Sequence, residues 1–198
     1  MNTAKQLHHL HATDRKSARG ASLVTASGCP VLDDMLPGGG WPKGGVVELV
    51  VPDDHAEAID LVMPALRRLS MQGRWIALVT PPLPSRASVF TDREINANHV
   101  LQVNQHPGRS GLWTVESMLR SGDCAAVLAW PGCDTELMDK RLQKAAVHGK
   151  SLCVLFRYES EATHPSGVDI RLKVEVSEGA RAVYRVNNRG DALSGAAI

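Results

Sequence analysis

The residues that follow an apolar run at 46–51 stand where many α/β proteins hold a phosphate group. The chain continues there as Pro52-Asp53-Asp54-His55-Ala56-Glu57. A phosphate-binding loop needs glycines that turn backbone N–H groups inward, a lysine that reaches the phosphate and a hydroxyl that holds Mg²⁺. This segment has none of these, and its three carboxylates, with Asp60 beyond them, take the place of an anion at the start of the next helix. The sequence therefore predicts that no nucleotide binds here.

No other combination of residues predicts catalysis or a metal site. Ser85, Asp92 and His99 lack the strand-to-helix turn that exposes a nucleophile. His8-His9-Leu10-His11 has no second group of ligands at a known spacing, so solvated histidines are favoured over a metal site. We therefore expect a protein that is not an enzyme and that holds no cofactor and no metal.

Composition and charge describe an ordinary globular chain. Hydrophobic residues make up 43% of the 198 residues and the formal net charge is +1, so no overall field favours nucleic acid or a membrane. The four cysteines form no Cys-x-x-Cys pair, which favours buried free thiols in a reducing compartment. No signal peptide opens the chain and no apolar run approaches the roughly 20 residues of a membrane helix. We expect a cytoplasmic protein that does not act at a membrane.

The elements that must position these residues alternate between strands and helices. Short apolar runs predict strands at 46–51, 75–79, 100–103, 125–130 and 152–156, with helices around 59–69, 112–120 and 135–147. Pro64 is expected to kink the first of these helices. Continuous apolar strands are typical of a parallel sheet that is covered on both faces. The predicted fold class is α/β, with a mainly parallel sheet flanked by helices.

The C-terminal part changes character. Residues 169–176 and 182–186 alternate between apolar and charged side chains around a turn at 177–179, which predicts an antiparallel hairpin with one wet face. A partner-binding hairpin and a merely solvated one both remain open. The expected organisation is a flexible basic arm at 1–26, a single domain at 27–186 and a flexible tail at 187–198.

Two stretches resemble the RecA superfamily of ATPases. Residues 27–49, with the box Pro37-Gly38-Gly39-Gly40-Trp41-Pro42, resemble the entry to the RecA nucleotide loop. Residues 120–130 lie where RecA-type ATPases have a strand that ends in a magnesium-directing Asp, but here the strand ends in Trp130. An indole cannot ligate Mg²⁺, and it would instead fill the vacated pocket. The resemblance implies a RecA-like sheet without ATPase activity.

The similarity is closer to the bacterial SulA/ImuA family, the RecA-like, non-catalytic proteins of the SOS DNA-damage response. It is carried by the Gly-Gly-Gly-Trp-Pro box, Leu66 to Trp75, Leu112-Trp113 and Leu119 to Trp130. The box resembles the ImuA branch, which implies an accessory role in translesion DNA synthesis with RecA and polymerase components as partners. The stretches 70–75 and 114–119 resemble SulA, which implies the alternative, a division inhibitor that binds FtsZ and blocks its polymerisation. The ImuA-type function is the first expectation.

The resemblance to SulA also places the partner surface near strand 75–79 and the loop that follows it. Arg74 precedes the strand, and the loop mixes an apolar residue with charges, as an interface anchor and its rim do. A basic hairpin adds a second candidate region, so the predicted partner-binding residues are Arg74, Arg86, Phe90, Arg93, Arg181, Arg185 and Arg189. A DNA-binding module is a third alternative, based on the basic arm and hairpin, but the near-neutral total charge argues against direct nucleic-acid binding.

Overall fold

The computed structural model describes residues 23–52, 56–82, 94–104, 109–132, 136–177, 180–187 and 189–198. Eight strands form one sheet in the order β10-β9-β8-β3-β7-β6-β4-β5. Their bounds are β3 Gly45–Val51, β4 Trp75–Val79, β5 Val100–Val103, β6 Cys124–Ala129, β7 Leu152–Tyr158, β8 Ile170–Ser177, β9 Ala180–Val186 and β10 Ala192–Ala197. A separate two-stranded sheet pairs β1, Val24–Thr25, with β2, Trp41–Pro42.

The six strands from β5 to β8 run parallel, and β9 and β10 add antiparallel strands at one edge. In the middle of the sheet Val47 of β3 is in register with Val154 on one side and Ile170 on the other. β3 and β6 are buried along their whole length, which explains why their sequences are apolar apart from Glu48 of β3. The predicted α/β fold with a mainly parallel sheet and a C-terminal antiparallel hairpin is confirmed.

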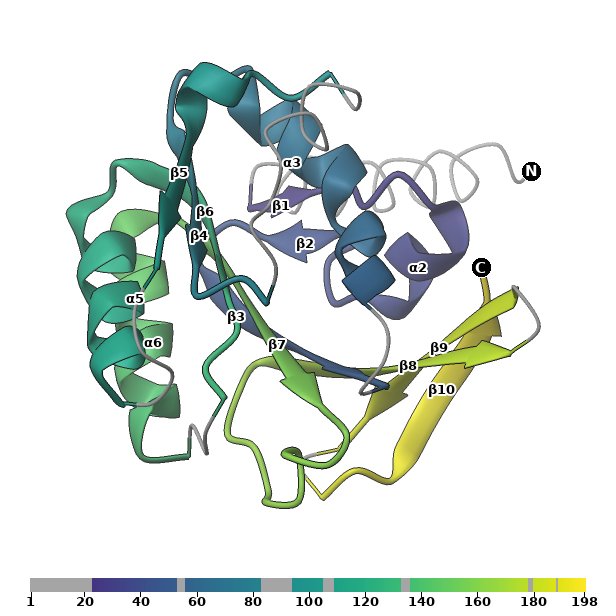
Figure 1. The fold of residues 1–198 in the computed structure, drawn as a ribbon. Coiled ribbons are helices and arrows are strands. Elements are labelled where there is room, and N and C mark those ends of the chain that lie inside the picture. The colour runs from purple at the N-terminus through teal and green to yellow at the C-terminus, as the bar shows by residue number, and fades with distance from the viewer. Residues whose placement is uncertain are drawn as a thin grey trace, which may run out of the picture.

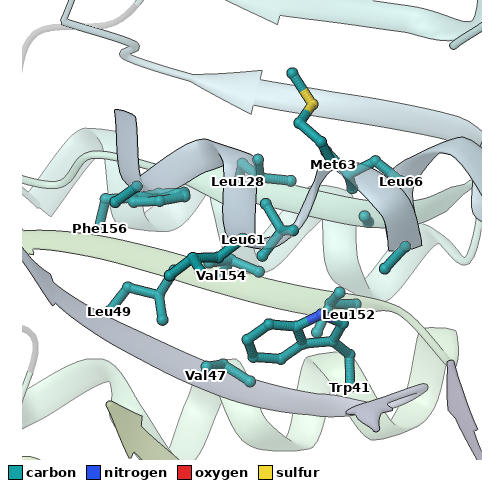
Figure 2. Packing of buried hydrophobic residues seen from close by; sticks show 14 of the residues in the cluster. Trp41, Val47, Leu49, Leu61, Met63, Leu66, Leu128, Leu152, Val154 and Phe156 are labelled. Atoms are coloured by element: carbon teal, nitrogen blue, oxygen red, sulfur yellow. The ribbon is translucent and has the colours of Figure 1, made fainter. Parts of the chain in front are cut away.

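Helices cover both faces of the sheet (Figure 1). The 3₁₀ helix η1, Ala56–Leu61, and the helix α3, Met63–Ser70, pack on one face with the short helix α2, Pro30–Met35. Figure 2 shows Leu61 between Leu128 and Val154, and the Trp41 indole beside Val47 and Leu152. The helices α5, Arg109–Ser121, and α6, Glu136–Gly149, lie together on the other face. No helix in the described part of the chain is long and apolar enough to cross a membrane.

The first helix differs from its prediction. The single helix expected around 59–69 is divided into η1 and α3, which meet at Val62. Pro64 lies in the first turn of α3, where the missing N–H of a proline would have no partner within the helix anyway. Pro64 therefore starts a helix and does not kink one.

The C-terminal residues also differ from the expected flexible tail, because Ala192–Ala197 pair with β9 as the edge strand β10. Alanine, serine and glycine have little β-propensity, so the sequence carried no strand signal there. Gly195 lies opposite Tyr184, and a Cβ at Gly195 would lie 2.3 Å from Cδ1 of that ring. Glycine thus allows the aromatic ring to pack across the edge strand.

A buried group of charges joins three central strands. The Glu48 carboxylate on β3 is 0% exposed, and it lies 3.3 Å from Nη1 of Arg157 on β7 and 3.4 Å from Nε of Arg171 on β8. The two guanidinium groups also hold the chain after β7, because Arg157 donates to the carbonyl of Glu161 and Arg171 donates to that of Ala162 at 3.0 Å. We call these three side chains the Glu48 cluster. It fixes the connection between β7 and β8 on this face of the sheet.

Candidate partner-binding surface

The carboxyl end of β3 is the position at which a phosphate-binding loop would begin. The following residues, 53–55, lie outside the described part of the chain, so the predicted role of Asp53 and Asp54 stays a prediction. Next comes η1, whose Leu61 is buried in the core and whose Asp60 carboxylate lies 3.3 Å from Nη2 of Arg181. The described residues after β3 therefore pack in the core through Leu61 and form an ion pair with the C-terminal hairpin through Asp60.

Trp130, at the carboxyl end of β6, packs against the core as expected. Its indole stacks on Phe156 of β7 with ring centroids 4.6 Å apart and an interplanar angle of 7°. Phe156 is itself buried, so the half-buried indole extends the apolar core up to the end of the sheet. Within the described ranges, no group of three or more His, Cys, Asp or Glu side chains could hold a metal ion. Stacked aromatic rings therefore lie at the carboxyl end of β6.

The glycine box shapes the entry to the core. Gly38 and Gly39 have φ angles of 84° and 80°, which favour glycine, and a Cβ at Gly40 would lie 2.6 Å from the carbonyl oxygen of Thr25. The turn thereby delivers Trp41, which is 0% exposed, into the core between α2 and the sheet. Trp41 is therefore a core residue.

Arg74 is engaged within the chain. Its guanidinium donates to the carbonyl oxygens of Gly122 at 3.1 Å, Cys124 at 2.6 Å, Gly149 at 2.7 Å and Lys150 at 3.1 Å, and Nη2 lies 3.3 Å from Ser151 Oγ. These acceptors follow α5 and α6, so the cation also meets the negative ends of both helix dipoles. Arg74 thus connects the start of β4 with the residues that precede or begin β6 and β7. Its predicted contact with a partner stays a prediction.

The predicted arginines of the C-terminal hairpin do not form one surface with Arg74. Arg181 and Arg185 lie on β9, and Arg189 lies in the turn before β10. β9 and β4 are separated by four strands in the sheet, which places them roughly 24 Å apart. Arg86, Phe90 and Arg93 lie outside the described residues. Their predicted role, like that of the hairpin arginines, remains a prediction.

An apolar groove lies directly beside Arg74. Trp75, Leu101 and Met118 line it together with Ser117, Ser121, Asp123 and Cys124, and its volume is about 370 Å³. Trp75, the first residue of β4, is 41% exposed, and Leu101, within β5, is 42% exposed. β5 is the edge strand at this side, so the groove lies between the sheet edge and α5. We call it the Trp75 groove.

The sequence did not predict the Trp75 groove, because Trp75 begins an apolar run that is typical of a fully buried strand. The signal was present at the edge strand, whose four residues Val100–Val103 include no charged side chain. An apolar side chain on an edge strand faces solvent when no further helix covers it, and grouped exposed apolar residues mark interaction sites. The groove is therefore the candidate partner-binding surface among the described residues.

Two of the cysteines are expected to be unreactive in the folded protein. Burial raises the pKa of the Cys124 thiol, with a further rise from Asp123, and burial also raises the pKa of the Cys153 thiol. Because the thiolate is the nucleophile, iodoacetamide should modify both only after unfolding in urea, whereas the half-buried Cys29 should react earlier. Peptide mass spectrometry after native and denatured labelling measures this, and native labelling of Cys153 would contradict the burial described above.

Comparison with known proteins identifies the group to which the chain is similar. The family model described as cell division inhibitor SulA matches residues 44–153, which is more than half of the chain. Cell division inhibitor SulA of Serratia proteamaculans is 25% identical over 138 residues, covering 70% of this chain and 82% of that protein. The Yersinia pestis protein of the same name is 28% identical over 132 residues, covering 67% of this chain and 79% of its own. A crystal structure of SulA from Pseudomonas aeruginosa aligns with a TM-score of 0.48 at 22% identity, covering 57% of this chain and 97% of that one.

These findings correct the first functional expectation. The prediction of an ImuA-type accessory protein for translesion synthesis is wrong, because the matched family model and these relatives are named as SulA division inhibitors. The RecA and polymerase partners that accompanied it have no support. The glycine box that suggested ImuA serves core packing in this fold and so carries no information about the partner. Since the family model spans more than half of the sequence, the chain belongs to the SulA family of cell division inhibitors.

Proposed function

We propose that this protein inhibits cell division by binding the tubulin-like protein FtsZ and blocking its polymerisation, without catalysing a reaction. The match to the SulA family over residues 44–153 carries the proposal. That interval runs from the start of β3 into β7, and it contains the Trp75 groove completely. In this proposal the protein acts in the cytoplasm as part of the SOS response.

The second part of the proposal is that the fold is a RecA-like ATPase frame that has lost its nucleotide site. Three features support it. The segment after β3 lacks the glycines, lysine and hydroxyl of a phosphate loop, and its Asp60 pairs with Arg181. The strand β6 ends in Trp130, whose ring stacks on Phe156. Apolar packing thus replaces the groups that would bind Mg²⁺ and phosphate.

The Trp75 groove supports a contact with a protein partner. An exposed tryptophan beside a shallow apolar groove is a common anchor of protein interfaces. Arg74 fixes the start of β4, so the Trp75 backbone is held in place before a partner arrives. A rigid anchor loses less conformational entropy on binding than a mobile one.

The proposal predicts that the purified protein lowers FtsZ polymerisation and GTP turnover, and that Trp75→Ala and Leu101→Ala each raise the inhibitory concentration about tenfold or more. Each substitution removes apolar area from the groove. Light scattering measures polymerisation, and phosphate release measures turnover. Leu193→Ala is the matched control, because Leu193 is 61% exposed on β10 at the opposite edge of the sheet.

Unchanged FtsZ polymerisation in the presence of an equimolar amount of the wild-type protein would refute the proposed function. Inhibition that Trp75→Ala and Leu101→Ala leave intact would retain the function and reject the groove as its surface. Urea unfolding of each variant distinguishes a loss of binding from a loss of stability. Because exposed side chains contribute little to stability, both variants should unfold near the wild-type urea concentration.

A further inference from the structure

The outward face of α5 and α6 has an unusual distribution of charge, because both carboxylates described on these helices are buried. Glu116 of α5 lies at the contact with α6. Its Oε1 is 2.8 Å from Nη2 of Arg120 on α5, and its Oε2 is 2.8 Å from Nη2 of Arg141 on α6. Asp139 is 1% exposed and accepts a hydrogen bond from the backbone N–H of Gly167 at 2.7 Å. Neither carboxylate faces solvent.

The exposed charged side chains described on the two helices are all cations: Arg120, Lys140, Arg141 and Lys144. Just beyond the helix ends, Asp123 after α5 and Lys150 after α6 are both exposed and offset each other. Counted along the sequence, these four cations are partly offset by Glu116 and Asp139, which gives a net charge of +2. Because both of these carboxylates are buried, the described side chains that face solvent on the two helices carry +4.

A tryptophan lies at the centre of this face. The Trp113 side chain is 52% exposed, and the guanidinium carbon of Arg141 lies 4.0 Å from its ring centroid. Arg141 is thus held between the Trp113 ring and the Glu116 carboxylate, which fixes the cation and the indole before any partner binds. Paired tryptophan and arginine side chains are the residues that most often dominate binding energy at protein interfaces.

We propose that this face, defined by Trp113, Arg120, Lys140, Arg141 and Lys144, binds an acidic segment of a protein partner that also presents an apolar side chain to the indole. The face joins α5 to α6 through Arg141, whereas the Trp75 groove joins α5 to β4 and β5. The inference therefore goes beyond the proposed function and does not depend on it.

The observations favour a protein segment over a nucleic acid. Single-stranded nucleic acid binds through several aromatic platforms on which successive bases stack. This face offers one indole, and Arg141 already covers one side of it. Two of the four cations share the Glu116 carboxylate, which weakens their attraction for a dense row of phosphates. An acidic peptide with one apolar anchor matches both the charge and the single exposed ring.

The experiment uses the full chain and a fluorescein-labelled peptide of alternating glutamate and aspartate with a central phenylalanine. Fluorescence anisotropy should show saturable binding that weakens as the salt concentration rises to about 150 mM. Lys144→Glu and Trp113→Ala should each weaken binding about tenfold or more. Arg68→Glu is the matched control, because it makes the same change of charge at an exposed residue on α3, which covers the other face of the sheet, and it should change binding less than about twofold.

Three outcomes would overturn the proposal. The first is that the wild-type protein does not bind the peptide at low salt, and the second is that Arg68→Glu weakens binding as much as Lys144→Glu does. The third is tighter binding of a single-stranded oligothymidine that Trp113→Ala abolishes, which would assign the face to nucleic acid. Because the face and the Trp75 groove share no residue, Lys144→Glu should leave FtsZ inhibition unchanged.

Discussion

Replacing Glu48 by leucine should lower the free energy of unfolding by about 3–5 kcal/mol. The Glu48 carboxylate lies within 3.4 Å of two guanidinium groups, and Arg157 and Arg171 are 1% and 5% exposed. Leucine leaves both cations buried without their shared counter-ion, and the cost of a buried uncompensated charge exceeds the gain from the added apolar contacts. A domain of this kind has about 5–15 kcal/mol of stability, so the variant should be close to the limit of folding.

Urea unfolding followed by circular dichroism measures the effect. Glu175→Leu on β8 is the matched control, because Glu175 is an exposed carboxylate that pairs with Lys173 at 3.1 Å, and its loss should cost less than about 1 kcal/mol. Adding Arg157→Met and Arg171→Met to Glu48→Leu should recover part of the stability. Recovery should stay incomplete, because the carbonyls of Glu161 and Ala162 then lose their donors. Equal stability of Glu48→Leu and the wild type would refute the structural role of the cluster.

The Glu48 cluster also shows where sequence reasoning reached its limit. The strand around Glu48 was predicted correctly from its apolar residues, and so were the strands that carry Arg157 and Arg171. The contact between them depends on β7 and β8 pairing with opposite sides of β3, which periodicity along one segment cannot reveal. Local patterns therefore predicted the strands, while the partners of buried charges followed only from the strand order.

The candidate site was less predictable than the fold. Arg74 was selected because it precedes a strand, but its neighbours in space are the carbonyls at 122, 124, 149 and 150, which are far away in the sequence. Trp75 was interpreted as part of a buried run, and its exposure results from the position of β5 at the sheet edge. An apolar residue is exposed when no neighbouring helix or strand covers it. Whether one does depends on the tertiary arrangement and cannot be predicted from the local sequence.

Arg74→Ala should lower the free energy of unfolding by about 2–4 kcal/mol, since it removes charge-assisted hydrogen bonds to four backbone carbonyls. Arg74→Lys should recover less than half of the loss, because an ammonium group keeps the charge near both helix ends but cannot reproduce the planar fork. Arg68→Ala is the matched control, as the described bond of Arg68 is a single one to the carbonyl of Ala26 at 2.7 Å, and it should cost about 1 kcal/mol or less. Urea unfolding measures all three.

The same variant separates a structural role of Arg74 from a direct contact with FtsZ. If Arg74 acts by holding the start of β4, the inhibition by Arg74→Ala should fall in proportion to its folded fraction, and inhibition per folded molecule should stay close to that of the wild type. Trp75→Ala should show the reverse, with near-normal stability and weakened inhibition, because the indole is 41% exposed at the groove. An Arg74→Ala protein that is as stable as the wild type but inactive would instead show that the guanidinium contacts the partner. The two neighbouring residues therefore have different roles: Arg74 stabilises the fold through bonds within the chain, and Trp75 faces outward at the binding surface.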